Sequence, residues 1–193
     1  MMAAAEVPAA EMSASGIFLV ATDELRDPNF RETVVLVTQP PRGGPFGVII
    51  NRPLSHRLSD VFPDYESLKS NKDVVYSGGP VARQGLLFLV RASQPPPRAT
   101  HVLKDVYFVA DPAGIDDLLK RFNPTRRLRV YAGHAGWAPG QLQNEITRGG
   151  WHVMPADADT VFEKDAASIW PELSKRAALR QTRFTKGVSA ASY

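Results

Sequence analysis

The stretch YAGHAGWAPGQLQNEITRGGW, residues 131–151, is the most individual part of the chain and contains a complete structural unit. The apolar run at 128–132 predicts a strand that leads into it. Glycines at 133, 136 and 140 predict a turn, residues 139–148 predict a short helix, and Gly149-Gly150 would end that helix. With a further strand at 151–154, the expected unit is strand, glycine-rich turn, helix and strand.

The predicted helix at 139–148 has an apolar and a polar stripe. Leu142 and Ile146 are four residues apart, so they should form its buried stripe. Gln141 and Glu145 have the same spacing and should lie at the rim of the core. There the polar pair either orients a neighbouring loop or faces a cleft.

Trp137 and Trp151 flank this helix, and two interpretations of the whole stretch stay open. In the structural one, the tryptophans cover the helix and the glycines permit close packing. In the functional one, free N–H groups and the positive end of the helix dipole, beside Gly136, form a site for an anion. Bulky aromatic side chains usually mark a core, which favours the structural interpretation.

Working outward, short apolar runs rich in β-branched residues predict strands, and apolar residues at helical spacing predict helices. Asp111 and Pro112 suit the N-cap and the first position of a helix. Strands gather early and helices late, which favours an α+β fold with a mixed or antiparallel sheet. The expected strands are 17–20, 33–38, 46–50, 73–76, 85–91 and 102–109, and the expected helices are 58–62, 112–122 and 165–179.

The composition is that of one globular domain. Of the 193 residues, 44% are hydrophobic and 22% are charged, so a sizeable core is expected rather than disorder. Residues 1–15 lack the basic start and the apolar run of a secretory signal and predict a disordered leader. Residues 16–180 would form the domain, and 181–193 a basic flexible tail.

Several function classes are excluded or disfavoured. The chain has no cysteine, so it has no disulfide framework, thiolate ligand or thiol nucleophile, and it suits a reducing cytoplasm. No apolar run approaches the roughly 18 residues of a membrane span. Phosphate-loop, dinucleotide and nucleophile-elbow patterns are missing, and the histidines are isolated. Asp157 and Asp159 predict turn and cap roles rather than a metal site, so we expect neither metal nor cofactor.

Basic residues gather in two places. Residues 174–193 contain five basic side chains and no acidic one, and 120–129 hold a second run. Such clusters bind nucleic acid or an anionic surface in some proteins and form a solvated face in most. We favour the solvated face, because no helix-turn-helix or β-ribbon signature supports sequence-specific DNA binding.

Two further groups of residues are candidates for holding a ligand. Gly78-Gly79 follows a predicted strand, where glycine lets the backbone turn sharply and approach a ligand, although a plain strand-to-loop corner is the commoner reason. Asn51 and Arg52 end another strand. Arg52 would either clamp a carboxylate or phosphate with its planar fork, or pair with Asp27 or another loop acid to join two connections. The residues themselves do not decide between these.

Together these groups define a candidate ligand cleft for a small anionic molecule or a protein partner. We expect no established catalytic, metal-binding or cofactor-binding residue in it. Its residues are Asn51, Arg52, Gly78, Gly79, Gly136, Trp137, Gln141 and Glu145.

An ordered set of short motifs points to a family. They are FLVA at 18–21, DPNF at 27–30, TVV at 33–35, GVIINRP at 47–53, GGPV at 78–81, GW at 136–137, QL at 141–142, Glu145 and Trp151. With this set the chain resembles the YqgE/AlgH family of bacterial proteins, from about residue 16 to about residue 175. The resemblance implies an α+β domain whose bifurcated sheet is partly curled into a small barrel and flanked by helices. The family is labelled as transcriptional regulators and offers no established catalytic residue to transfer.

Two positions depart from the pattern that the resemblance implies. Many relatives have an acid–histidine pair where this chain has Thr38-Gln39, and a proline where it has Thr22. If that histidine acted in catalysis, this chain would lack the activity. We therefore expect a non-enzymatic cytoplasmic binding or regulatory protein. The alternative is an enzyme that acts on a phosphorylated or other anionic small molecule at the helix N-terminus within 136–145, with Glu145 or His134 as general base.

Overall fold

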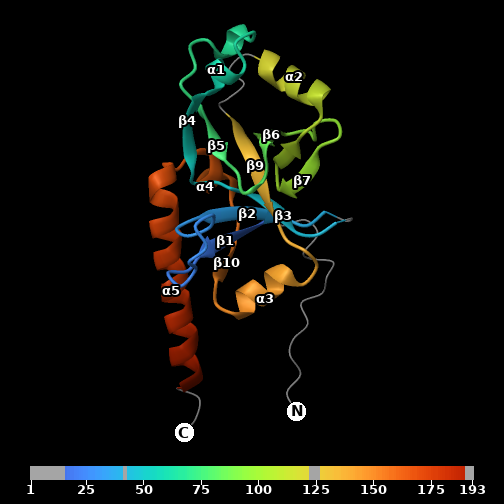
Figure 1. Ribbon diagram of the computed structural model, residues 1–193. Coiled ribbons are helices and arrows are strands. Elements are labelled where there is room, and N and C mark those ends of the chain that lie inside the picture. Colours follow the sequence, from blue (N-terminus) through green and yellow to red (C-terminus); the bar gives the residue numbers. More distant parts are fainter. Residues whose placement is uncertain (1–15, 41–42, 122–126, 190–193) are drawn as a thin grey trace.

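One branched β-sheet organises the chain, and helices lie around it (Figure 1). The computed structural model of the protein describes the backbone of residues 16–40, 43–121 and 127–189, and side chains in this part as far as Arg180. The predicted leader at 1–15, Phe122 at the end of a predicted helix, and residues 190–193 lie outside the described residues. The predicted α+β class with a mixed sheet is confirmed.

Ten strands of the described residues belong to the sheet. Along its main path they pair in the order β10, β1, β2, β3, β9, β6, β8 and β7, while β4 and β5 form a branch that joins β9. The pairing of β5 with β9 is parallel, and the other pairings are antiparallel. The strands are β1 (Ile17–Ala21), β2 (Val34–Thr38), β3 (Phe46–Ile49), β4 (Pro53–Arg57), β5 (Val74–Ser77), β6 (Val81–Arg91), β7 (Thr100–Leu103), β8 (Val106–Val109), β9 (Leu128–Gly136) and β10 (Trp151–Pro155).

The sheet divides at β9. Along one edge of this strand, Tyr131 pairs with Tyr76 of β5, and further on Gly136 pairs with Phe46 of β3. Gly133 lies between the two pairings at a φ of 73°, a left-handed conformation that glycine adopts without strain. The turn predicted from Gly133, Gly136 and Gly140 is confirmed only at Gly140, because Gly133 and Gly136 lie inside β9, where Gly133 lets the strand bend.

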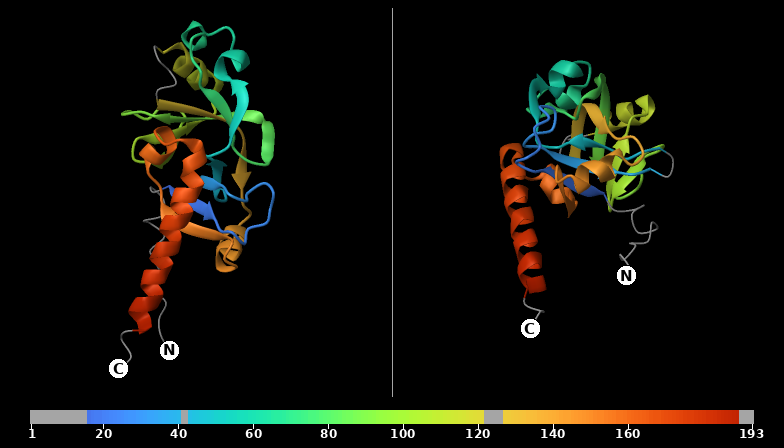
Figure 2. Two further views of the ribbon diagram at one scale, coloured as in Figure 1. Left: turned by 90° about the vertical axis from the view of Figure 1, so that its left-hand side faces the viewer. Right: turned by 60° about the horizontal axis from the view of Figure 1, so that its bottom comes forward.

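The main path of the sheet curls until its two ends approach each other. The Gly16 N–H donates to the carbonyl oxygen of Val102 over 2.8 Å, which joins the start of β1 to β7. This curled part is the predicted small barrel, and Figure 2 shows it from two further sides. Apolar side chains fill its interior, among them Phe18, Val20, Leu36, Val48, Leu89, Val106 and Phe108.

Two features of the sheet differ from expectation. The single strand expected at 102–109 is wrong, because β7 and β8 form a hairpin that turns at Lys104, whose φ is 40°. Apolar residues stand on both sides of that turn, so periodicity gives no sign of it. Strand β4 is not predicted, since it is a largely exposed strand at the end of the branch, of mixed polarity, that begins with Pro53.

Most helices begin where expected. The α2 helix starts at Pro112, and the Asp111 carboxylate accepts from the Gly114 N–H over 3.1 Å, which confirms the predicted cap. Asp157 caps α4 in the same way through the Thr160 N–H. The helical segments are α1 (Leu58–Val61), the 3-10 turn η1 (Glu66–Leu68), α2 (Pro112–Lys120), α3 (Gln141–Thr147), α4 (Ala158–Phe162) and α5 (Ala166–Ser189).

The last helix packs beside the sheet and then extends past it, as both figures show. Ile169 and Leu173 are buried, and the Trp170 indole donates to the carbonyl oxygen of Ala21 over 2.9 Å, so the predicted inward face is confirmed. The helix continues to Ser189, beyond its predicted end at 179 and into the predicted flexible tail at 181–193. No proline stands between 180 and 189 to end it.

Tyr131 is a fully buried phenol inside the barrel, with its ring 5.8 Å from that of Tyr76. Its hydroxyl has no hydrogen-bond partner within the described part of the chain. Burial raises the pKa of Tyr131 well above its ordinary value, because a phenolate there would be desolvated.

We expect Tyr131→Phe to raise the free energy of unfolding by about 1 kcal/mol, because the variant removes a buried hydroxyl that gains no hydrogen bond. Urea unfolding at neutral pH measures this change. Above about pH 10 the unfolded chain releases the phenol proton and the native state keeps it, so the stability of the native protein should fall with pH more steeply than that of the variant. Tyr107→Phe, at a half-buried tyrosine, is the control. A less stable Tyr131→Phe protein would contradict the assignment.

Candidate functional site

Arg52 fastens the connection between β1 and β2. Its guanidinium donates to the carbonyl oxygens of Asn29 (2.6 Å), Arg31 (3.0 Å) and, more distantly, Pro28 (3.4 Å). Burial, followed by the charge of Arg31, lowers the pKa of Arg52. Arg52 therefore joins two connections, as one of its two interpretations predicts. Its acceptors are main-chain carbonyls, however, and Asp27 accepts instead from the Asn29 N–H.

Asn51 holds the end of the same connection. Its Oδ1 accepts from the Val34 N–H over 2.9 Å, and its Nδ2 donates to the carbonyl oxygen of Glu32 over 3.0 Å. Both polar ends of the amide are thus occupied by backbone. Asn51 acts as a brace at the start of β2.

Gly78 and Gly79 lie directly against β9. The Gly78 N–H donates to the carbonyl oxygen of Ala132 over 2.8 Å. A Cβ on Gly78 would lie 2.2 Å from the Gly133 carbonyl oxygen, and one on Gly79 would lie 2.4 Å from the His134 carbonyl group. These distances are far below a van der Waals contact, so only glycine fits. The backbone that approaches these glycines belongs to the protein itself.

Glu145 is the centre of a hydrogen-bonded network at α3. One carboxylate oxygen accepts from the indole N–H groups of Trp137 (3.0 Å) and Trp151 (2.9 Å), and the other accepts from the amide of Gln141 (3.0 Å). The Gln141 carbonyl oxygen in turn accepts from the Ala138 N–H over 3.1 Å. The polar pair therefore orients the loop before α3, which is one of the two roles expected for it.

Phe30 connects this network with the segment that Arg52 fastens. Its ring stacks on Trp137 with centroids 6.3 Å apart and meets the edge of Trp151 at 5.6 Å. Leu142 and Ile146, the predicted apolar stripe of α3, pack in the same cluster as the two tryptophans. Leu142 is buried and Ile146 is half-buried.

The structure does not gather the eight predicted residues in one cleft. Arg52 and Gly79 line a shallow pocket of about 270 Å³ together with Asn29 and Arg83. Asn51 and Gly78 support the surrounding backbone. The remaining four, Gly136, Trp137, Gln141 and Glu145, belong to β9 and the α3 network and do not line that pocket.

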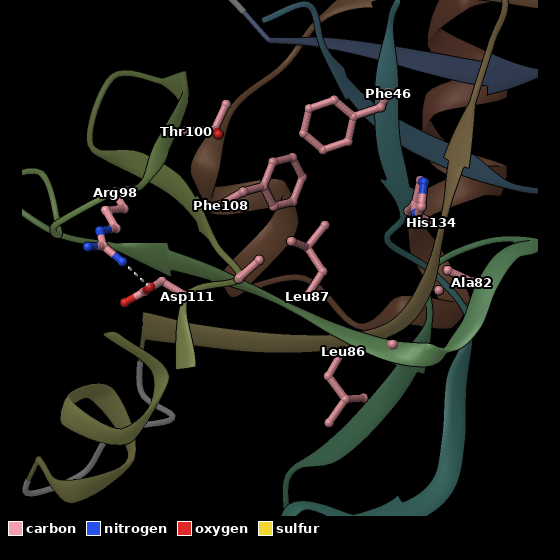
Figure 3. A pocket seen from close by; sticks show the side chains of 12 residues that line it. Phe46, Ala82, Leu86, Leu87, Arg98, Thr100, Phe108, Asp111 and His134 are labelled. Carbon is pink, nitrogen blue, oxygen red and sulfur yellow. Dashed lines mark hydrogen bonds and ion pairs between the residues drawn. The ribbon is translucent and has the colours of Figure 1, made fainter. Parts of the chain in front are cut away.

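A different pocket, of about 370 Å³, opens where β3, β6, β8 and β9 meet (Figure 3). Phe46, Leu87 and Phe108 give it an apolar floor, with the two phenylalanine rings 5.3 Å apart. Arg98 stands at one end, paired with Asp111 over 3.0 Å. Of the lining residues, only His134 is a candidate for chemistry from the sequence; Asp111 and Gly133 have structural roles there, and the others resemble ordinary strand and loop residues.

Polar groups that the fold leaves unused line this pocket. Within the described part of the chain, neither the His134 ring nor the Thr100 hydroxyl has a hydrogen-bond partner. The His134 ring lies nearly perpendicular to that of Phe46, with centroids 6.5 Å apart. Ala82 and Arg98, both lining residues, have φ angles of 48° and 55°, a left-handed conformation that non-glycine residues rarely adopt and that gathers at functional sites.

The described residues contain neither a metal-binding cluster nor a membrane-spanning helix. Among them, no group of three or more His, Asp or Glu side chains lies together so as to hold a metal ion. None of the helices described is both long enough and apolar enough to cross a membrane.

The chain belongs to the AlgH-like family, whose model (DUF179) matches residues 18–181. A UPF0301 protein from Thermobifida fusca is 35% identical over 173 residues, covering 86% of this chain and 87% of that protein. A UPF0301 protein from Streptomyces coelicolor is 33% identical over 167 residues, covering 85% and 86%.

Two solved structures share the fold. The crystal structure of protein DIP2367 from Corynebacterium diphtheriae has a TM-score of 0.69 and 26% identity, and the match covers 84% of this chain and 86% of that one. The solution structure of the AlgH protein from Pseudomonas aeruginosa has a TM-score of 0.68 and 24% identity over 92% of each chain, which supports the fold alone. None of these names states a reaction.

We expect Glu145→Ala to lower the free energy of unfolding by about 2 kcal/mol, because it leaves two buried indole N–H groups without acceptors. Chemical denaturation measures the change, and a shift in tryptophan fluorescence should accompany it. Gln143→Ala, on the exposed face of the same helix, should stay within about 0.5 kcal/mol of the native protein. Equal stability of the two variants would show that Glu145 is no brace.

We expect Arg52→Lys to lower the free energy of unfolding by about 1–2 kcal/mol, because one ammonium group cannot reproduce the planar fork that reaches several carbonyls. Thermal unfolding of the variant, beside Arg26→Lys at an exposed arginine, provides the measurement. An unchanged melting temperature in Arg52→Lys would mean that these hydrogen bonds do not hold the connection.

Proposed function

We propose that this AlgH-like protein is a non-enzymatic binding protein that takes a small molecule in the pocket of Figure 3. A single observation carries the proposal: the unused polar groups of His134 and Thr100 lie over an apolar floor. Ligand sites commonly combine an apolar lining with a few polar groups that orient the ligand, at volumes of about 300–1,000 Å³. The pocket, at about 370 Å³, falls in this range.

The contacts of Glu145, Gln141 and His134 support a binding rather than a catalytic role. A general base must reach a substrate proton, but Glu145 accepts from two indoles and an amide. The α3 helix is short, with seven residues. The Ala138 N–H before its first turn already donates to the Gln141 side chain, so it is not free for an anion. His134 has no carboxylate that orients its ring within the described residues, so it lacks the arrangement of an activated base.

The charges of the described residues support a partner other than DNA. In the basic run at 120–129, Lys120 and Arg121 pair with Asp116 and Asp117 over 2.6 and 3.1 Å. Arg129 donates to the carbonyl oxygen of Phe162 over 2.6 Å. These contacts fit the solvated-face interpretation, and the lack of cysteine fits a cytoplasmic location. A regulatory role would follow if the bound ligand altered a protein contact.

Ala110→Trp tests the proposal, because Ala110 is an exposed residue at the pocket that a larger side chain can fill without entering the core. Saturation-transfer NMR with a fragment library should show fragments that bind the native protein and are lost in this variant. Ala167→Trp, on the exposed face of α5, should bind as the native protein does. After prolonged incubation the fragments should be chemically unchanged. Fragment turnover, or binding that Ala110→Trp leaves intact, would overturn the proposal.

A further inference from the structure

We infer that the pocket of Figure 3 is suited to an aryl carboxylate, with the carboxylate at Arg98 and the ring over Phe46 and Phe108; this inference rests on the proposed function. The pocket is polar at its ends and apolar between them. Arg98 and Thr100 lie at one end, Leu87 and the two phenylalanines lie in the middle, and His134 lies at the other end.

The apolar middle is suited to a flat ring. The Phe46 and Phe108 rings are 5.3 Å apart and inclined by 38°, and both line the pocket. Aromatic rings favour offset and edge contacts over perfect stacking. The His134 ring, perpendicular to Phe46 at 88°, extends this wall at its far end.

The end at Arg98 is suited to an anion. Asp111 holds one guanidinium nitrogen at 3.0 Å, and no other hydrogen bond from this side chain occurs within the described residues. A guanidinium has five N–H donors, so most of the fork stays available for a second carboxylate. The Thr100 hydroxyl, two residues on, is free to donate to the same group.

Asp111 does not cancel this preference. It is the one acid among the lining residues, and its second oxygen accepts from the Gly114 N–H at the start of α2 over 3.1 Å. The positive end of that helix offsets part of its negative charge. Asp111 is therefore a positioning residue that holds the guanidinium of Arg98 at the edge of the pocket.

Comparing 2-naphthoate with 2-naphthamide tests the inference, since the two probes share a shape and differ in charge. Titrations of the full chain followed by amide NMR should show about fivefold tighter binding of the naphthoate, a modest preference because Arg98 is largely exposed. Arg98→Met should abolish this preference while keeping the naphthamide affinity. Arg83→Met, which removes an arginine outside this pocket, should keep it. Raising the salt concentration should shrink the preference in the native protein.

The outcomes separate this inference from the proposed function. Equal binding of both probes, or a preference that survives Arg98→Met, would overturn the carboxylate assignment and leave the pocket as a binding site. Binding of other fragments but of neither naphthalene probe would overturn the ligand class alone. If no fragment binds in a manner sensitive to Ala110→Trp, the proposed function fails and the inference fails with it.

Discussion

The structure depends on a contact between two pieces of backbone, Gly78-Gly79 and the bend of β9 at Gly133. Cβ atoms on these glycines would lie 2.2–2.6 Å from opposing carbonyl groups, so no side chain can separate the segments. Because β9 bends here, β5 and β3 both pair along one of its edges, and the sheet branches. Gly133 and His134 also line the pocket of Figure 3. The branch point and the proposed binding site are thus built on the same few residues.

Residues that have the chemistry of an active site serve mainly as braces. Arg52 and Asn51 hold main-chain groups of residues 28–34, and Glu145 holds two tryptophans that both contact Phe30. The long connection between β1 and β2 is therefore fixed from both flanks. A buried indole N–H or an unpaired main-chain carbonyl is costly, which explains why strongly polar side chains occur in an aromatic cluster.

Much of the fold could be predicted from local signals. Apolar runs indicated most strands, and Asp111 before Pro112 marked the start of α2, because these patterns act over a few residues. The course of β9 through its glycines could not be found in this way, since it depends on the distant Gly78-Gly79. The spacing of Gln141 and Glu145 identifies them as a unit, but the acceptor role of Glu145 depends on Trp151 of another strand. The pocket of Figure 3 could not be predicted, because β3, β6, β8 and β9 bring its lining together and no single segment contains it.

The pairing of β1 with β10 affects how the chain must fold during synthesis. Ile17 of β1 lies opposite Pro155 of β10. The hydrogen bond from Gly16 to Val102 then joins β1 to β7 and closes the barrel. The ribosome releases the β1–β2 hairpin long before β7 and β10 are synthesised. During that time β1 has an unpaired edge, which can pair with strands of other chains. Contacts between such distant residues form slowly. Among the described strands, β1 therefore gains its second neighbour only after β10, the last of them in the sequence, has been translated.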